Sequence, residues 1–376
     1  MKAFHIGDLH LGKRVYEFSM LEEQKELIEQ ILQKIDEEQP DVLFMTGDIY
    51  DKPIPPVEAV CLLDSFLTEL SNRKLHTYII AGNHDSAQRL EFGNALMAKG
   101  NVFICGNPDK TIVSYKEEDA YGEVYIHLLP FFKPAHVNGL LNTAAVSYQE
   151  AAELLLAENA VDTTKRNILL AHQFVSWKGV VERSDSETAS VGGVDEIGSE
   201  IFADFDYVAL GHLHSPQKVG RDTVRYAGSP MPYSFSEVRQ QKGITVAELR
   251  EKGVCEIDFI PLETTKKFRE LKGPLAEILQ AAKADDRKED YIRCILTDTE
   301  ALFDPVGQIR SVYPNLMTLE REQQMQKRQL DLVMETDELQ PNELFADFFE
   351  KQTGKALTEE QQSILQNIWE GLEELQ

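Results

Sequence analysis

The sequence predicts an α/β protein in which parallel strands alternate with helices, followed by a smaller α+β segment and helices at the carboxyl end. Short apolar runs alternate with longer amphipathic segments over residues 1–265, which is typical of βαβ units. Metal-binding side chains directly follow five of these runs. Near residue 266 the pattern changes to shorter, more charged segments. These observations divide the chain into 1–265, 266–330 and 331–376.

Length and composition restrict the class of protein. A chain of 376 residues can form two or three domains, and 42% hydrophobic with 27% charged residues is ordinary for a globular protein. No run approaches the roughly 18 apolar residues of a membrane span, and the polar cluster Gly7–His10 stands where a secretory signal would be apolar. We therefore expect a cytoplasmic protein with no membrane partner. The four cysteines form no C-x-x-C pair, which indicates neither a disulfide framework nor a thiolate zinc site, and we expect them to be buried.

The first region is predicted element by element. A strand at Ala3–Ile6 leads to Ser19-Met20-Leu21-Glu22, which has the form of a capping box, and apolar residues recur at helical spacing until Pro40. Further strands are expected at Val42–Met45, Thr77–Ala81, Ile168–Ala171 and Tyr207–Leu210. Further helices are expected at Pro56–Leu70 and Ala144–Ala157. Because strands connected through helices run parallel, their carboxyl ends should share one edge.

Each of the five apolar runs is followed at once by polar side chains that can bind metals. These candidate ligands are Asp8 and His10, Asp48, Asn83, His172, and His212 and His214, with His84 beside Asn83. In open α/β sheets, such loops converge outside the carboxyl ends of the strands. In an extended backbone, residues two apart point the same way, so Asp8 with His10, and His212 with His214, could each hold one cation.

The chemistry of this set indicates divalent cations. Carboxylate, imidazole and carboxamide donors without thiolate suit Mn²⁺, Fe²⁺, Zn²⁺ or Mg²⁺, and the histidines argue against a site for magnesium or calcium alone. Seven ligands fit two ions about 3.5–4 Å apart, as in two-metal phosphoester hydrolases. A single Asp or His after a strand is more often a helix cap or a surface residue, so the prediction depends on the whole set. We expect structural roles for His5, His76, His127 and His136, and an orienting role for Asp51 and Asp85.

The segment 266–330 is predicted to be a small α+β module. Strands are expected at Tyr291–Leu296 and Leu316–Leu319, and a helix is expected at Val306–Val312. A basic stretch precedes them, with Lys266, Lys267, Arg269 and Lys272. These cations are candidate phosphate contacts, and a solvated basic linker is an equally good interpretation.

The segment 331–376 is the most acidic part, per residue, of a chain whose net charge is -26. Amphipathic helices are expected at Asn342–Phe349 and Glu359–Leu375. Their aromatic faces need a covering surface, which is either a partner or the first domain of this chain. The negative charge counts against strong binding of DNA by this chain alone.

Five motifs together resemble those of the calcineurin-type metallophosphoesterases. They are Gly7-Asp8-Leu9-His10, Gly47-Asp48-x-x-Asp51, Gly82-Asn83-His84-Asp85, His172 and Gly211-His212-Leu213-His214. More narrowly, residues 1–260 are similar to the SbcD group, the nuclease subunits of bacterial SbcCD complexes. This similarity is carried by Asp8–Lys13, Ala171–Val175, Val191–Gly193, Phe205–His214 and Tyr226–Pro230.

The resemblance implies a sandwich of mixed sheets flanked by helices. It also implies that 266–330 is a capping domain that positions DNA, and that the terminal helices dock on SbcC, an SMC-like ATPase. One metal would be held by Asp8, His10 and His214, a second by Asn83, His172 and His212, and Asp48 would bridge both. The resemblance makes His84 the catalytic residue, which stabilises the transition state or protonates the leaving oxygen.

The implied activity is that of a DNA nuclease with two divalent metal ions, for which Mn²⁺ is expected. It would be a 3′–5′ exonuclease on duplex ends and an endonuclease on hairpins and single strands, ATP-dependent through SbcC, in DNA repair, recombination and replication. A homodimer within a heterotetramer, near the bacterial nucleoid, is also implied. Two rival interpretations are a hydrolase of small phosphoesters and a non-catalytic assembly protein. A protein phosphatase is disfavoured, because that group has arginine at the position of Lys52 and glutamate at the position of Asp85.

Overall fold

The computed structural model describes residues 1–187, 195–322, 349, 357–358 and 361–362. The chain separates into two units, of which the first comprises Met1–Arg269 and Glu289–Ile292 and the second Glu270–Lys288 and Arg293–Gln376. The helices expected at Asn342–Phe349 and Glu359–Leu375 lie outside the described residues, apart from isolated positions, as does most of the segment 331–376.

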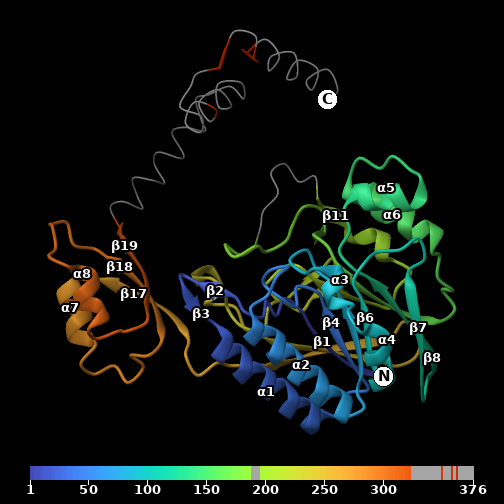
Figure 1. The fold of residues 1–376 in the computed structure, drawn as a ribbon, viewed down its shortest axis with the longest axis horizontal. Coiled ribbons are helices and arrows are strands. Elements are labelled where there is room, and N and C mark those ends of the chain that lie inside the picture. Colours follow the sequence, from blue (N-terminus) through green and yellow to red (C-terminus); the bar gives the residue numbers. More distant parts are fainter. Residues whose placement is uncertain (188–194, 323–348, 350–356, 359–360, 363–376) are drawn as a thin grey trace. The chain divides into compact units, whose positions relative to one another are not determined.

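Within the described residues, the first unit is built on two six-stranded mixed sheets (Figure 1). The first sheet, in spatial order, contains β16 (Cys255–Pro261), β15 (Gly243–Leu249), β1 (Lys2–Ile6), β4 (Val42–Thr46), β5 (His76–Ile80) and β6 (Val102–Cys105). The second contains β13 (Gln217–Val219), β14 (Arg221–Tyr226), β12 (Tyr207–Gly211), β9 (Arg166–His172), β8 (Gly122–Leu129) and β7 (Val113–Asp119).

The central strands of both sheets run parallel, which confirms the predicted fold class. In the first sheet β1, β4, β5 and β6 pair in parallel, and β15 and β16 are antiparallel. In the second sheet β8, β9, β12 and β14 pair in parallel, and the edge strands β7 and β13 are antiparallel. The carboxyl ends of the parallel strands therefore share an edge in each sheet.

The two sheets pack face to face around a shared apolar core. Ile168 and Leu170 of β9 contribute to this core, together with Phe44 of the first sheet. Leu169 and Ala171 belong to a second cluster on the opposite face of β9. Because both faces of β9 are buried, the strand is a continuous apolar run rather than an alternating one.

Helices cover the outer faces of the sandwich. Helices α1 (Leu21–Glu38) and α2 (Val57–Asn72) lie side by side in Figure 1, and α5 (Pro134–Leu141) and α6 (Tyr148–Glu158) pack together on the outer cluster of the second sheet. The expected capping box at Ser19 is wrong, because Ser19 belongs to a short strand and the helix begins after Met20 with no side-chain cap.

The remaining elements of the first unit are short. They are β2 (Arg14–Val15), β3 (Phe18–Ser19), α3 (Ala87–Leu90), α4 (Asn94–Met97), β10 (Val175–Ser176), β11 (Ile197–Gly198) and the 3₁₀ turns at Ala98–Gly100, Ser199–Phe202 and Phe235–Glu237. The helix expected from Ala144 begins only at Tyr148, since the Ser147 hydroxyl accepts the Glu150 N–H and caps it.

The second unit contains a three-stranded sheet with two short helices. Its elements are β17 (Phe268–Gly273), α7 (Leu275–Ala281), β18 (Tyr291–Leu296), α8 (Pro305–Arg310) and β19 (Leu316–Arg321), and β17 and β18 begin in the first unit. The basic stretch is therefore partly a strand rather than a linker. Cys61 is exposed, which corrects the expectation that all cysteines are buried. No helix in the described part of the chain is long and apolar enough to span a bilayer.

Candidate metal centre

Five strand ends bring all eight predicted site residues together. The residues that follow β1, β4 and β5 in the first sheet are Asp8, His10, Asp48, Asn83 and His84. Those at the ends of β9 and β12 in the second sheet are His172, His212 and His214. Loops far apart in the sequence therefore meet where the parallel strands of both sheets end.

The backbone of these loops is not extended, which corrects the geometry expected for residues two apart. Asp8, His10 and Asp48 have φ values of 53°, 45° and 48°, and His212 has 112°. Such conformations cost about 1–2 kcal/mol per residue. Hydrogen bonds between the loops hold them, because Asp8 N donates to the Gly47 carbonyl at 3.1 Å and His10 N to the Asp48 carbonyl at 2.8 Å.

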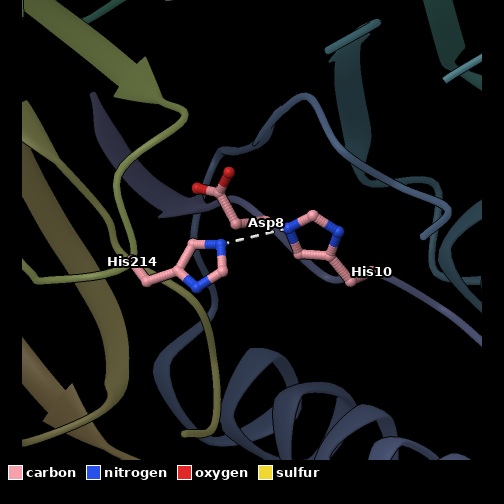
Figure 2. A group of neighbouring side chains, drawn as sticks. All are labelled: Asp8, His10 and His214. Carbon is pink, nitrogen blue, oxygen red and sulfur yellow. Dashed lines mark hydrogen bonds between the residues drawn. The ribbon is translucent and has the colours of Figure 1, made fainter. Parts of the chain in front are cut away.

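The first candidate cluster consists of Asp8, His10 and His214 (Figure 2). One donor atom from each lies within 4.8 Å of the others, and all three side chains are buried. The Nε2 atoms of His10 and His214 face each other at 3.1 Å, as Figure 2 shows. Among the described residues, buried Nδ1 of His10 has no hydrogen-bond partner. Facing imidazole nitrogens beside a carboxylate fit a cation between them.

Asp48 lies between the two halves of the site. Its Oδ2 is 3.7 Å from Nε2 of His10 and 3.5 Å from Nε2 of His172. Its Oδ1 accepts the backbone N–H of His84 at 2.9 Å, which orients the carboxylate. A carboxylate within reach of histidines on both sides has the geometry of a bridging ligand.

The second candidate cluster is centred on Asn83. Its Oδ1 lies 3.0 Å from Nε2 of His172 and 2.9 Å from Nδ1 of His212. Nδ1 of His172 donates to the Thr46 carbonyl at 2.7 Å, so Nε2 is the ring atom that points toward the Asn83 oxygen and that would bind a cation once it has lost its proton. With Nε2 deprotonated, the imidazole nitrogen and the amide oxygen are both lone-pair donors suited to a shared cation.

The buried charges have strongly shifted pKa values. Burial raises the pKa of Asp8 to about 7, against the opposing effect of His172 and His214. Burial would also raise the pKa of Asp48, but His172 and His10 hold it well below its usual range. Burial lowers the pKa of His172, but Asp48 outweighs this and raises it to about 9. Without cations the cluster therefore retains protons near neutral pH that divalent ions would displace.

His84 stands beside the clusters rather than within them. Its ring meets the ring of His10 edge to face, with centroids 4.9 Å apart, and a donor atom lies within 4.8 Å of one on His10 and one on Asp48. Nδ1 of His84 donates to the Asp51 carbonyl at 3.0 Å. His84 is less buried than His10 or Asp48, so its ring can reach a substrate bound at the site.

Asp51 and Asp85 have the orienting contacts expected of them. The Asp85 carboxylate accepts backbone N–H groups from Ile49, Tyr50 and Gly82 at 2.9–3.1 Å, and so ties the loops after β4 and β5 together. The Asp51 carboxylate accepts the Lys13 ammonium at 2.7 Å and lies 3.7 Å from Nδ1 of His10.

Sequence reasoning missed the residues that surround His214. They are Ser186, Glu187, Glu237 and Lys242. Ser186 contacts ring Nδ1 of His214, Glu187 accepts its backbone N–H, and Lys242 donates to its carbonyl oxygen. Glu237 accepts the hydroxyl of Ser186. No local motif marks them, because they lie 23 to 28 residues away from His214 along the chain on either side. Only the folded structure shows that they belong to the site.

The four cations of the basic stretch are all paired with carboxylates. The nearest pairs are Lys266 with Glu23 at 3.5 Å, Lys267 with Glu263 at 2.6 Å, Arg269 with Asp290 at 2.7 Å and Lys272 with Glu322 at 2.6 Å. Their charges are therefore largely balanced within the fold. Their role as phosphate contacts stays a prediction.

Comparison with known families agrees with this geometry. The family model described as calcineurin-like phosphoesterase matches residues 1–216. A second model, described as type 5 capsule protein repressor C-terminal domain, matches residues 264–353. Among solved structures, a dimetal phosphatase from Danio rerio has a TM-score of 0.40 at 13% identity, covering 70% of this chain and 99% of that chain.

Relatives extend over nearly the whole chain. The SbcD subunit of the SbcCD nuclease of Staphylococcus epidermidis is 31% identical over 324 residues, which cover 85% of this chain and 85% of the relative. The SbcD subunit of Staphylococcus saprophyticus is 27% identical over 377 aligned residues, which cover 99% of this chain and 98% of the relative. The chain therefore belongs to the calcineurin-like phosphoesterase family and, within it, to the metal-dependent SbcD subunits of SbcCD nucleases.

Proposed function

We propose that this chain hydrolyses DNA phosphodiesters with two divalent cations held at the edge where the two sheets meet. The observation that carries the proposal is the convergence of seven oxygen and nitrogen donors in two clusters, with Asp48 in reach of both. Asp8, His10 and His214 would hold one cation, and Asn83, His172 and His212 the other. When bound, the cations supply Lewis acidity, which neutralises phosphate charge and makes an attacking water more acidic.

His84 is the residue that we propose to act on the substrate itself. Because its Nδ1 donates to the Asp51 carbonyl, proton exchange with substrate is left to Nε2. The protonated ring would give a proton to the leaving oxygen, or donate a hydrogen bond to the phosphate oxygens as negative charge develops on them. The Asp51 carbonyl thereby sets the direction in which the ring acts.

A cavity beside the second cluster supports a nucleotide substrate. It has a volume of about 280 Å³, and Asn83 and His212 line it together with Phe131, Tyr148 and Phe174. Aromatic walls stack on bases of any sequence, and a lysine on the same cavity, Lys133, is suited to a phosphate. A hydrolase of small phosphoesters that contain no base would not need aromatic side chains along this cavity.

The names of the relatives, which identify them as subunits of the SbcCD nuclease, support a more detailed proposal. We propose 3′–5′ exonuclease action on duplex ends and endonuclease action on hairpins and single strands, in DNA repair and recombination. An SbcC-type ATPase would supply ATP hydrolysis and would dock on the segment 331–376. The module 266–330 would position DNA, and two copies of the chain would form the core of a heterotetramer.

Mn²⁺ is the cation that we propose for both sites. Four imidazole nitrogens together with carboxylate and carboxamide oxygens suit divalent ions of intermediate softness such as Mn²⁺. Mg²⁺ prefers a set of oxygen donors only. The donor set also contains no thiolate, which separates it from structural zinc sites. Titration of the metal-free chain with Mn²⁺, Zn²⁺ and Mg²⁺ would rank the three ions, and Mg²⁺ as the tightest of the three would contradict this choice.

The decisive experiment measures Mn²⁺-dependent cleavage of linear duplex DNA, hairpin DNA and a small phosphodiester by the full chain, with and without an SbcC-type ATPase. We expect cleavage of DNA that EDTA abolishes and that is lost in Asp48→Ala. Asp41→Ala, which changes an exposed carboxylate remote from the clusters, is the matched control and should keep full activity.

Two outcomes would overturn the proposal. Turnover of the small phosphodiester alone, even with the ATPase present, would make the chain a small-molecule phosphodiesterase. Absence of any turnover with intact Mn²⁺ binding and intact docking of the ATPase would indicate an assembly protein.

A further inference from the structure

His214 has hydrogen-bond partners on its backbone and on its ring Nδ1. Its backbone N–H donates to Glu187 Oε1 at 2.6 Å, and its carbonyl accepts the Lys242 ammonium at 2.7 Å. Its ring Nδ1 lies 2.7 Å from the Ser186 hydroxyl oxygen. Nδ1 of His10, by contrast, has no hydrogen-bond partner among the described residues.

The Ser186 hydroxyl has a second neighbour that decides the direction of its hydrogen bonds. It lies 2.5 Å from Oε1 of Glu237, and a carboxylate can only accept. The single hydroxyl proton therefore goes to Glu237, and the oxygen accepts the proton of Nδ1 of His214. In this tautomer Nε2 carries the lone pair, and Nε2 is the atom that faces His10 in the first cluster.

Glu237 is itself fixed in place within the fold. It is fully buried, and its Oε2 accepts the buried Lys242 ammonium at 2.6 Å. The hydroxyl of Ser234 donates to Oε1 at 2.9 Å, and the Ser229 hydroxyl oxygen accepts the same Lys242 ammonium at 3.0 Å. Because each group has partners, this buried ion pair is a rigid anchor rather than an uncompensated charge.

From these contacts we propose that Ser186 is a positioning residue for the first cation site, acting through His214 and anchored by Glu237. The Glu237 carboxylate orients the hydroxyl, the hydroxyl fixes the tautomer of His214, and Nε2 of His214 is thereby presented to the cation. The inference rests on the proposed function, since it assigns a role toward the cations of that site. His172 has the equivalent support from a backbone carbonyl, which no substitution can remove, whereas Ser186 can be changed.

The test measures Mn²⁺ binding to the full metal-free chain by isothermal titration calorimetry, with no reliance on activity. Loss of an outer hydrogen bond to a ligating histidine typically weakens metal binding about 10–100-fold. We therefore expect Ser186→Ala to weaken one of two Mn²⁺ sites by about that factor and to leave the other unchanged. Ser186→Thr, which keeps the hydroxyl, should restore wild-type binding.

The matched control is Ser184→Ala in the same segment. Ser184 is buried and Ser186 half-buried, and the Ser184 hydroxyl accepts the Gln240 side-chain N–H at 3.3 Å and does not contact His214. This variant should bind both ions as the wild type does. Thermal unfolding of all variants in EDTA separates a loss of ligand positioning from a loss of folding, because a positioning role leaves the melting temperature of the metal-free chain unchanged.

A second measurement needs no variant at Ser186. In the metal-free chain labelled with ¹⁵N-histidine, we expect His214 to carry its proton on Nδ1, with His214→Gln used to assign the signal. A proton on Nε2 in the wild type would overturn the proposal, as would unchanged Mn²⁺ affinity at both sites in Ser186→Ala.

The outcomes also separate this inference from the proposed function. If the wild type binds no Mn²⁺, or if Asp48→Ala binds it unchanged, the two-cation site itself fails. If the wild type binds two ions and Ser186→Ala binds them equally well, only the role of Ser186 fails.

Discussion

His5 and His10 lie on the same segment and are almost equally buried, but their ring nitrogens meet different surroundings. Nδ1 of His5 lies 2.9 Å from the Tyr207 hydroxyl, and Nε2 lies 3.2 Å from the Thr46 hydroxyl. His10 faces another imidazole and a carboxylate instead. Burial therefore does not distinguish a structural histidine from a candidate ligand, whereas the kind of group that the ring nitrogens face does.

Substitution of His84 tests its role at the scale of one residue. We expect His84→Gln to lower the kcat for DNA cleavage by about 10²–10⁴-fold, because a positioned proton donor contributes about that factor. Its Mn²⁺ affinity should be unchanged, since the seven donors remain. His136→Gln changes an exposed histidine and should leave kcat unaltered. Timed DNA-cleavage assays at saturating Mn²⁺ measure kcat, and calorimetric titration of the same samples measures Mn²⁺ affinity. A His84→Gln variant that cleaves DNA at the wild-type rate would contradict the role assigned to His84.

His5 gives the fold a pH dependence that can be isolated. Burial lowers the pKa of His5 to about 3, whereas the unfolded chain titrates near 6.5, so only the unfolded state takes up this proton between those values. Stability due to neutral His5 is therefore complete above pH 6.5 and falls by about 1.4 kcal/mol per unit below it.

The neutral isostere His5→Gln should remove this contribution. Urea unfolding in EDTA at pH 7.5 and 5.5 would measure it, and we expect the wild type to lose about 1 kcal/mol more than the variant over this interval. Groups other than His5 titrate equally in both proteins and cancel from the comparison. Parallel pH profiles for the two proteins would show that His5 does not contribute.

At the scale of elements, the site depends on a very close approach of strand ends. A Cβ built on Gly211, at the end of β12, would lie 1.9 Å from the Thr46 carbonyl of β4. A Cβ on Gly82, after β5, would lie 2.1 Å from Oδ1 of Asp48. Glycine is required at both positions for steric reasons, because no side chain fits between the loops.

Gly82→Ala should therefore damage the site through Asp48. The added methyl group overlaps the carboxylate that lies between the clusters, so we expect Mn²⁺ affinity to fall at both sites by at least about tenfold, in line with losses on disturbing ligand orientation. Gly139→Ala, in α5, meets nothing within 4 Å and should bind both ions normally. Calorimetric titration of the two variants makes the comparison, and tight binding of two ions by Gly82→Ala would refute the steric argument.

At the scale of the whole molecule, the candidate ligands join the two sheets of the first unit. Asp8 and Asp48 follow strands of the first sheet, and His172 and His214 come from the second. A cation bound between them would cross-link the sandwich in the folded state only. At a Mn²⁺ concentration of 100 times Kd, one such site stabilises the fold by about 2.7 kcal/mol.

We therefore expect Mn²⁺ to raise the melting temperature of the full chain above its value in EDTA. Asp48→Ala should melt at the same temperature with and without Mn²⁺, because it removes the residue between both clusters. Differential scanning calorimetry across a Mn²⁺ series measures the effect. A melting temperature of the wild type that does not depend on Mn²⁺ concentration would contradict a cross-linking site.

The net charge of -26 predicts that the isolated chain has a low affinity for DNA. The cations of the basic stretch are paired with carboxylates, so this stretch leaves few positive charges to displace counterions from the duplex. We expect the chain alone to bind duplex DNA weakly and to bind it less as the salt concentration rises. Fluorescence anisotropy at about 50 and 200 mM salt measures this, because phosphate contacts weaken strongly over that range. Tight binding that is independent of salt would contradict this expectation.

Much of the fold and most of the candidate site could be predicted from local sequence signals. Apolar runs such as Ile168–Ala171 predict buried strands, and the residue types that follow them predict cation chemistry. Parallel connection through helices then predicts that loops from Asp8 to His214 share one edge. These inferences succeed because periodicity and strand-to-loop position are properties of a short stretch of chain.

Only the tertiary structure decided how the site is held. The left-handed conformations of Asp8, His10 and Asp48 depend on hydrogen bonds between loops, and local residue types would favour other conformations. The position of Asp48 between two histidines, and the contact of Ser186 with His214, join segments that are far apart in the sequence. The sequence by itself determined which chemistry the loops carry, whereas the packing of two sheets decided which atoms face each other, because distances between remote segments depend on the whole fold.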